Sequence, residues 1–211
     1  MKILNLYSGL GGNRYKWGKE HNITAVELDE TIATMYQKRF PGDKVIVEDA
    51  HSYLLNHYKE FDFIWSSPPC PTHSTMQVSM KTKRVMRYPD MTLYQEIILL
   101  DNFFQGKYCV ENVISYYKPL IEPKKRGRHY YWTNFNLPYN LNERKAPGMK
   151  DKDELKKWSN FYNYDFDKYK GNIDKRTLAR NMVDYEVGKT ILDIAYNVRK
   201  KESISQIFLK I

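Results

Sequence analysis

Short apolar runs alternate with longer amphipathic segments along the first half of the chain. The runs are typical of buried strands and occupy residues 2–7, 23–26, 44–47, 61–65 and 107–110. The longer segments have the spacing of helices and occupy residues 13–20, 29–40, 51–58 and 93–104. Strands that alternate with helices of this length favour an α/β fold, with a mostly parallel sheet and helices on both faces.

Turn-forming residues and less regular segments separate or follow these elements. Asp29 is a candidate N-cap for the helix that Pro41 and Gly42 end. Residues 72–92 lack a clear period and predict a long loop, of a kind that is often functional. The remaining segments predict, in order, a strand at 129–135, an irregular stretch at 136–175 and a helix at 185–199.

The composition fits an intracellular globular protein. A chain of 211 residues is long enough for one domain with a small appendage, and 42% hydrophobic residues can form a core. No stretch is apolar and long enough to cross a bilayer, and the first residues predict a strand rather than a signal peptide. Cys70 and Cys109 form neither a disulfide framework nor a metal-ligand spacing, which favours a reducing compartment and no metal site.

The net charge of +9 is compatible with a polyanionic partner such as nucleic acid. Excess lysine is common on solvated surfaces, so the distribution of the charge says more than its sum. Two clusters of basic residues stand out, and both lie near the candidate catalytic residues described below. They comprise Lys81, Lys83, Arg84 and Arg87, then Lys124, Lys125, Arg126 and Arg128.

A glycine-rich turn follows the first predicted strand. It reads Tyr-Ser-Gly-Leu-Gly-Gly at residues 7–12 and precedes the first predicted helix. Glycines there permit a tight turn and the close approach of a ligand to the amides of a helix N-terminus. The turn is not a full dinucleotide-binding pattern, and a purely structural turn is the alternative interpretation.

Carboxylates end the next two predicted strands. Glu27 ends the second strand, where a carboxylate can bind the hydroxyl groups of a ribose. Asp49 ends the third strand and is a candidate acceptor for an adenine amino group. Alone, Glu27 can be a solvated charge and Asp49 the N-cap of the next helix. Together with the glycine turn, the three strand ends outline a site for an adenosine-containing cofactor.

The fourth and fifth strand ends carry candidate catalytic groups. Pro68 and Pro69 stiffen the turn that places Cys70 after the fourth strand, and Glu111 ends the fifth. A thiolate attacks an electron-poor ring carbon, and a nearby carboxylic acid can protonate a ring nitrogen. The alternatives are a chance cysteine in a proline-rich loop and a carboxylate that pairs with a structural arginine.

Arg128 lies in an Arg-Gly-Arg sequence just before the strand predicted at 129–135. Its guanidinium can hold a carbonyl or a phosphate, or can lower the pKa of a nearby thiol. A basic surface turn is the alternative interpretation.

In this order and strand context, the motifs resemble those of the DNA (cytosine-5) methyltransferase family. The resemblance covers residues 2–135, and Pro-Pro-Cys followed by Glu-Asn-Val is its most specific part. It resumes at about residues 178–200, where Asn181-Met182-Val183 is similar to the family's final motif, which closes the cofactor pocket.

The resemblance implies a Rossmann-like, S-adenosylmethionine-dependent methyltransferase fold and a mechanism. A cytosine flips out of double-stranded DNA into the pocket. Cys70 then adds to carbon 6 of the ring, while Glu111 engages nitrogen 3 and the exocyclic amine and Arg128 holds the carbonyl side. Carbon 5 takes the methyl group from S-adenosylmethionine, and loss of its proton releases Cys70.

The resemblance also implies binding residues and a division of the chain. The cofactor contacts are expected at Tyr7, Ser8, Gly9, Gly11, Gly12, Glu27, Leu28, Asp49, Ala50, Pro68, Asn181 and Val183. The DNA contacts are expected at Ser74, Lys81, Lys83, Arg84, Arg87 and Arg126, on a loop that closes over the DNA and at the arginine motif. The implied parts are a catalytic domain at 1–135, a small target-recognition-like insert at 136–180 and a C-terminal helix at 181–211 that returns to the catalytic domain.

The chain departs from the family pattern in three regions. Pro71 and His73 stand where the family usually has Gln and an aromatic residue. Lys124 and Lys125 stand upstream of the arginine motif, which usually begins with Gln, and the insert is much shorter than a usual target recognition domain. The aromatic residues of the insert can stack on bases or form a small core, and we favour the core. Sequence recognition is therefore expected to be short or loose, or to come from a separate recognition subunit. The setting implied is the cytoplasm of a prokaryotic or phage-infected cell.

Three alternatives stay open. An amino methyltransferase uses a Pro-Pro-aromatic turn without a thiol, and Ser67-Pro68-Pro69 fits this halfway. RNA can replace DNA as the substrate under the same catalytic logic. A non-catalytic or regulatory nucleic-acid-binding module that kept the fold is the third alternative.

Overall fold

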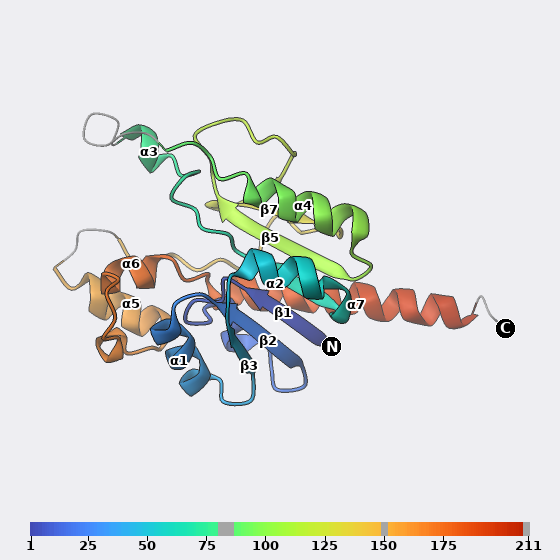
Figure 1. Ribbon diagram of the computed structural model, residues 1–211, viewed down its shortest axis with the longest axis horizontal. Helices are drawn as coiled ribbons and strands as arrows, with labels where there is room; N and C mark the ends of the chain where they lie inside the picture. Colours follow the sequence, from blue (N-terminus) through green and yellow to red (C-terminus); the bar gives the residue numbers. More distant parts are fainter. Residues whose placement is uncertain (80–86, 149–151, 209–211) are drawn as a thin grey trace.

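The computed structural model describes residues 1–79, 87–148 and 152–208. Its centre is a seven-stranded sheet in the order β3-β2-β1-β4-β5-β7-β6 (Figure 1). The strands are β1 (Lys2–Leu6), β2 (Asn22–Glu27), β3 (Lys44–Val47), β4 (Phe63–Ser66), β5 (Lys107–Val113), β6 (Lys124–Arg126) and β7 (His129–Thr133). The first five strands in the sheet order run parallel, and only β7 runs antiparallel to its neighbours. The predicted mostly parallel α/β sheet is confirmed.

One face of the sheet is covered by α2 (Ala50–His57) and α4 (Thr92–Phe103) (Figure 1). The short 3₁₀ turn η2 (Tyr58–Glu60) follows α2 directly. Alternate strand residues point to this face because side chains alternate along a strand. The buried residues that pack there include Leu4, Val26, Ile64, Leu54 and Leu100.

The other face is covered by α1 (Glu30–Arg39), the 3₁₀ turn η1 (Asn13–Lys16) and α7 (Tyr185–Phe208). The intervening strand positions, such as Ile3, Phe63 and Trp65, pack here against Ile191 and other residues of α7. The indole of Trp17 donates a hydrogen bond of 3.0 Å to the carbonyl of Gly188 in α7. The C-terminal helix therefore returns across the first half of the chain.

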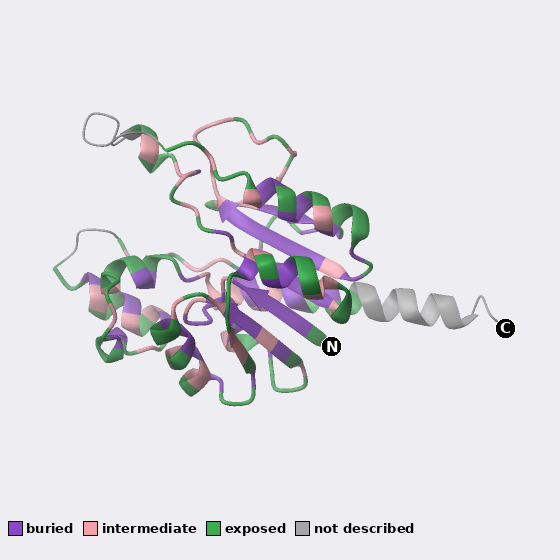
Figure 2. Cartoon of the chain, in the orientation of Figure 1, coloured by how far each residue is buried: buried purple, intermediate pink, exposed green. Residues whose placement is uncertain are grey.

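The insert forms a small aromatic core beside α1. Its elements are α5 (Glu154–Tyr162), η3 (Phe166–Lys168) and α6 (Lys175–Arg180). Trp158, Tyr162, Phe166 and Tyr169 are all buried, as the purple segments of this region illustrate (Figure 2). The small core that the sequence favours over base stacking is present.

The insert core is continuous with the part of the chain that forms the sheet. Leu10 of the glycine turn and Ile32 of α1 belong to it. Arg39 of α1 donates hydrogen bonds to the carbonyls of Leu10, at 2.9 Å, and Tyr162, at 3.0 Å. The insert is thereby fixed against the glycine turn.

Several elements differ from their predictions. The helix predicted at 13–20 is only a 3₁₀ turn, because Gly18 has a positive φ of 83°. The loop predicted at 72–92 contains a short helix, α3 (Met76–Ser79). The strand β6, the helices α5 and α6 and the extension of α7 to Phe208 lie beyond the predicted elements. The segments at 124–126 and 175–180 are too short to show a period, whereas Leu155, Trp158 and Tyr162 of α5 follow helical spacing that the prediction of an irregular stretch missed.

Candidate functional site

The candidate site lies where the parallel strands of the sheet end. The loop after β1 has an unusual backbone, with positive φ at Tyr7 (53°), Gly9 (52°) and Gly11 (70°). A methyl group on Gly9 would meet no atom within 4 Å, so open space lies in front of this loop. A methyl group on Gly11 would collide with the rings of Tyr36 and Phe40. The predicted tight turn is present, and it leaves room on one side.

Glu27 joins the ends of β1 and β2. Its carboxylate accepts hydrogen bonds from the backbone amides of Gly9, at 2.9 Å, and Asp29, at 3.0 Å. Burial raises the pKa of Glu27, and these amide hydrogen bonds partly oppose that rise. The carboxylate is held at the strand end, where the sequence predicts a ribose contact.

The next strand end combines a capping carboxylate with exposed apolar residues. Asp49 accepts a hydrogen bond of 2.8 Å from the amide of Ser52 and caps α2. This is the N-cap role that the sequence offers as the alternative to an adenine contact. The oxygen that accepts this hydrogen bond is Oδ1. A contact between the other carboxylate oxygen and an adenine amino group is compatible with the cap. Leu28 is 68% exposed and Val47 is 53% exposed, and both lie at the ends of β2 and β3. Ala50 begins α2 and is buried.

The loop before α7 closes against the glycine turn. A methyl group on Gly12 would lie 3.0 Å from the backbone nitrogen of Val183 and still closer to its carbonyl oxygen. Asn181 ends α6 and is exposed. The segment predicted to close the cofactor pocket is therefore in contact with the predicted cofactor loop.

Ser8 offers a buried polar atom within this loop. The residue is 5% exposed, and its hydroxyl has no hydrogen-bond partner among the described residues. Buried hydroxyl groups are normally paired, so an unpaired one beside open space suits a polar ligand. Together with the open space before Gly9, this observation fits an adenosine-containing ligand.

Cys70 is held by hydrogen bonds on both sides. The side-chain amide of Asn112, on β5, donates a hydrogen bond of 2.9 Å to the carbonyl of Pro68. The amides of His73 and Ser74 donate to the carbonyl of Cys70, at 3.0 and 3.1 Å. Burial, with a contribution from the negative charge of Glu111, raises the pKa of the thiol to about 11. The free protein therefore holds Cys70 mainly as the neutral thiol at neutral pH.

The side chains of Glu111 and Arg128 have different partners in the structure. Glu111 is buried, and its Oε1 lies 3.5 Å from Nε2 of His129. The Arg128 side chain is 65% exposed, and its Nε lies 3.3 Å from Oε1 of Glu143. The structure thus brings Cys70 and Glu111 into electrostatic contact and places Arg128 in an ion pair outside this contact.

The predicted DNA-binding residues have different surroundings. Ser74 and Arg87 flank part of the loop after Cys70, and Arg87 is exposed. Arg126 is partly committed to the protein, because its guanidinium donates to the carbonyls of Leu137 and Pro138, at 2.9 and 2.6 Å. Lys81, Lys83 and Arg84 lie outside the described residues.

A buried carboxylate below the strand ends was not predicted. Glu96 of α4 is fully buried and accepts hydrogen bonds of 2.6 Å from the hydroxyls of Tyr7 and Ser66. His51 Nδ1 lies 3.3 Å from the same carboxylate, which raises the pKa of that imidazole. The signal in the sequence is a charged residue between Leu93 and Leu100 on the apolar face of a predicted helix.

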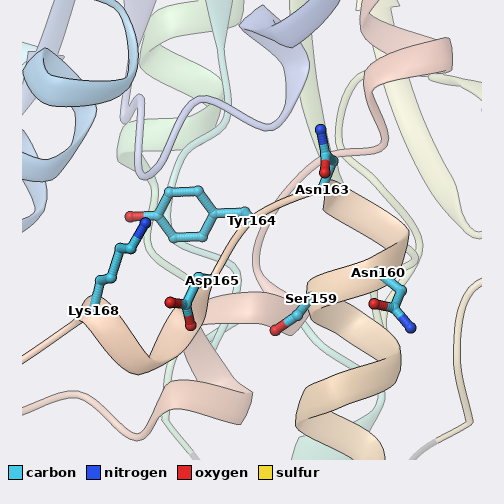
Figure 3. A pocket seen from close by; sticks show the side chains of 6 residues that line it. All are labelled: Ser159, Asn160, Asn163, Tyr164, Asp165 and Lys168. Carbon is cyan, nitrogen blue, oxygen red and sulfur yellow. The ribbon is translucent and has the colours of Figure 1, made fainter.

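A shallow hollow lies elsewhere, on the surface of the insert. It is lined by Ser159, Asn160, Asn163, Tyr164, Asp165 and Lys168 (Figure 3). None of the predicted site residues lines it, and its lining side chains are mostly polar. It is distinct from the strand ends.

The described residues contain neither a metal-ligand cluster nor a helix that could span a membrane. In this part of the chain, no group of three or more His, Cys, Asp and Glu side chains could hold a metal ion. Likewise, none of the helices in the described ranges combines the length and the apolar character of a membrane span.

The comparison with protein families decides the assignment. A family model described as C-5 cytosine-specific DNA methylase matches residues 1–118, which is more than half of the 211 residues. The chain belongs to this family. The match includes the glycine turn, Glu27, Asp49, Cys70 and Glu111, and the chain is thus a methyltransferase. Among curated proteins, none matches the sequence.

Several solved structures have partial similarity to this chain, and three of them illustrate its extent. A DNMT2 mutant from Spodoptera frugiperda is 25% identical over 53% of this chain and 35% of that chain, with a TM-score of 0.38. A hypothetical protein from Thermus thermophilus, TTHA0928, is 16% identical over 63% and 73% of the two chains, with a TM-score of 0.44. The putative methyltransferase yhhF from Escherichia coli is 15% identical over the same shares, with a TM-score of 0.42.

Membership in the family identifies the cofactor. C-5 cytosine methylases use S-adenosylmethionine, and the fold of this member is the Rossmann-like methyltransferase fold. The loop around Ser8 and Gly9, with Glu27 beside it, has the space and the polar groups that such a cofactor needs.

Proposed function

We propose that this member of the C-5 cytosine methylase family methylates carbon 5 of cytosine in double-stranded DNA through a covalent adduct on Cys70. The observation that carries the proposal is the Cys70–Glu111 pair at neighbouring strand ends, fixed by the hydrogen bond from Asn112 to Pro68. A nucleophile and an acid in this arrangement suit addition to a ring that must gain a proton as it is attacked.

The chain's own residues divide the work of the reaction. DNA delivers the cytosine in a flipped-out state, because the ring atoms of a stacked base are out of reach. The sulfur of Cys70 bonds to carbon 6, nitrogen 3 accepts a proton from Glu111, and carbon 5 becomes nucleophilic. S-adenosylmethionine supplies the methyl group that carbon 5 takes. Loss of the carbon 5 proton to water and cleavage of the sulfur–carbon bond then release Cys70, and the nitrogen 3 proton returns to Glu111.

Arg128 retains the role of holding the carbonyl side of the base in this proposal. Its exposed guanidinium would exchange Glu143 for the base when DNA binds. An exposed ion pair is worth only about 0.2–1 kcal/mol, so this exchange requires little energy. Arg87 and Ser74, with Lys81, Lys83 and Arg84, would contact phosphates, and Arg126 would combine a phosphate contact with its bonds to the chain.

Buried aromatic residues in the insert support a limited role for the insert in recognition. Trp158, Tyr162, Phe166 and Tyr169 are in its core and are not free to stack on bases. We therefore keep a separate recognition subunit, or loose sequence recognition, within the proposal.

The test measures methyl transfer from labelled S-adenosylmethionine to duplex DNA, with RNA of the same sequence in parallel. DNA that contains 5-fluorocytosine should trap a stable protein–DNA adduct, and Cys70→Ser should abolish both transfer and adduct. Cys109→Ala is the matched control, because Cys109 is fully buried in the sheet and should leave the adduct intact.

Three outcomes contradict the proposal. An adduct that persists in Cys70→Ser removes the role of Cys70. Transfer to RNA without transfer to DNA changes the substrate. An intact protein that binds S-adenosylmethionine without any transfer favours the non-catalytic alternative.

A further inference from the structure

Glu111 of β5 and His129 of β7 form a side-chain pair across two neighbouring strands. Antiparallel pairing sets Glu111 opposite Tyr131 and Val113 opposite His129. Glu111 and His129 therefore lie on one face of the sheet as diagonal neighbours, within reach of each other's side chains. Their closest atoms, Oε1 and Nε2, are 3.5 Å apart.

The low exposure of both side chains favours stable pairing between them. The Glu111 side chain is only 8% exposed, and that of His129 is 26% exposed. A buried carboxylate needs a partner for its charge, because desolvation disfavours an isolated ion. Arg128, which precedes His129 in the sequence, pairs instead with Glu143 at 3.3 Å.

We propose that His129 is a positioning residue that orients Glu111 and shares one proton with it, so that this proton is available to the cytosine ring. The inference rests on the proposed function and deepens it. When the Cys70 sulfur bonds to carbon 6, the ring's electrons shift toward nitrogen 3, and nitrogen 3 accepts the proton of the pair. When the sulfur–carbon bond breaks, the proton returns from nitrogen 3 to the pair.

A shared proton also bears on the nucleophile. The negative charge of Glu111 opposes formation of the Cys70 thiolate. A proton on the His129–Glu111 pair neutralises that charge, so the same proton assists thiolate formation and later protonates the ring. A histidine suits this role because imidazole gains and loses a proton near physiological pH.

Other titratable groups face the pair and have to be considered in any pH profile. Glu111 acts electrostatically on side chains from the turn after β4, from β5, from β7 and from α5. These are Cys70, Cys109, Tyr131 and Tyr162. Both tyrosines have pKa values raised mainly by burial and stay neutral over the range that matters, so they do not mimic the pair.

The experiment compares the pH profile of single-turnover methyl transfer in the wild-type protein and in His129→Gln. Glutamine can still donate a hydrogen bond to Glu111 but cannot carry the titrating proton. We expect a rate about 10- to 100-fold lower, within the usual range for general acid catalysis. The alkaline limb of the profile should differ from that of the wild-type protein, because the proton shared across the 3.5 Å contact is lost with the imidazole.

His57→Gln is the matched control. His57 also contacts a glutamate, with Nδ1 2.6 Å from Oε1 of Glu60, but this pair is exposed at the end of α2. The control should keep the wild-type rate and profile. The affinity for S-adenosylmethionine, measured by calorimetry, should be unchanged in both variants and shows that each is folded; His129→Asn replaces His129→Gln if the latter is unfolded.

The outcomes separate this inference from the proposed function. A wild-type protein that transfers methyl groups, with a His129→Gln variant of unchanged rate and alkaline limb, overturns the role of His129 alone. A lower rate with an unchanged alkaline limb shows a purely structural role and also overturns it. Failure of the wild-type protein to form the 5-fluorocytosine adduct overturns the proposed function instead.

Discussion

At the scale of single residues, hydrogen bonds hold the backbone at Cys70, and its thiol is neutral at neutral pH. Burial comes first among the causes that raise its pKa to about 11, and the charge of Glu111 adds to it. In the proposed reaction, protonation of Glu111 would remove the negative charge that opposes ionisation of this thiol.

The reactivity of Cys70 should follow this pKa. Alkylation by iodoacetamide should be slow at pH 7.5 and should increase toward pH 11, since only the thiolate reacts. Glu111→Gln should move the profile to lower pH, because the variant removes the negative charge but keeps the size of the side chain. The measurement is the rate of alkylation against pH, read by mass spectrometry.

Cys70→Ser provides the background for that experiment. Cys109 is buried and should react only after unfolding. A Glu111→Gln profile identical to that of the wild-type protein would contradict the electrostatic link between the two residues.

The sequence predicts the neighbourhood of these residues better than their contacts. Parallel order and strand ends are enough to expect Cys70 beside Glu111. The ion pair of Arg128 with Glu143 depends on the turn at Gly127, where φ is 52°, and on the path of the insert. Neither can be read from the motif, so the sequence does not reveal this ion pair, and the contact of Arg128 with the base stays a prediction.

At the scale of elements, two close contacts join the C-terminal segment to the N-terminal half. The backbone of Val183 lies against Gly12, and the backbone of α7 at Gly188 lies against Asn13. Both glycines permit approaches that any side chain would prevent. The glycine turn is therefore held by α7 as well as by its own strand.

Gly12→Ala should destabilise the protein by about 1–3 kcal/mol, the usual effect of overpacking. The added methyl group would press on backbone atoms of Val183, which cannot move aside like the end of a flexible side chain. Urea unfolding measures the loss. Gly42→Ala is the control, because nothing lies within 4 Å of its added methyl group. Equal stability of the two variants would show that the contact is relaxed in solution.

Arg144 should be the most sensitive cation at the junction of insert and α7. Its guanidinium lies 3.7 Å from the ring centre of Phe161 and 3.6 Å from that of Tyr185, and it bonds to Asp184 at 2.8 Å. Arg144→Lys loses the planar contact with both rings and should lower the free energy of unfolding by about 1–2 kcal/mol.

The control for Arg144→Lys is Lys156→Ala on the exposed side of α5, which should change stability by less than about 0.5 kcal/mol. Thermal unfolding reports both variants. If Arg144→Lys unfolds at the wild-type temperature, the stacking at this junction contributes nothing measurable.

The sequence prediction missed both helices of the insert. In α5, Leu155, Trp158 and Tyr162 follow helical spacing, so the signal for this helix is present in the sequence. Glu154 is also buried there, which is acceptable because Arg180 of α6 donates two hydrogen bonds to it, at 2.6 and 2.7 Å. That pair depends on the tertiary structure, and α6 has only six residues, too few to show a clear period.

At the scale of the whole molecule, the positive charge should decide how strongly nucleic acid binds. The chain carries a net charge of +9, and a cluster of four basic residues follows Cys70. Each neutralised phosphate releases counterions, so affinity falls as salt rises.

Replacing Lys81, Lys83, Arg84 and Arg87 by Gln should flatten this salt dependence. Four phosphate contacts correspond to a slope of roughly −3.6 in log K against log salt, which is roughly a 100-fold loss for a fourfold rise in salt. Fluorescence anisotropy with duplex DNA measures the slope for the wild-type protein and for the variant.

The control variant replaces four lysines at or beside the amino ends of the strands, Lys2, Lys44, Lys59 and Lys107, and removes the same charge. It should keep a slope close to that of the wild-type protein. Equal slopes in the two variants would mean that DNA responds to the net charge and does not contact the cluster.

The direction of α7 has a practical consequence. The helix begins at Tyr185, close to the glycine turn, and its 24 residues carry the backbone away from the catalytic edge (Figure 1). At 1.5 Å per residue it spans about 36 Å. A sequence-reading protein joined beyond this helix would need a tether at least that long to bring its target to Cys70. The length of the tether would then set how far from the bound sequence a cytosine can lie and still be methylated.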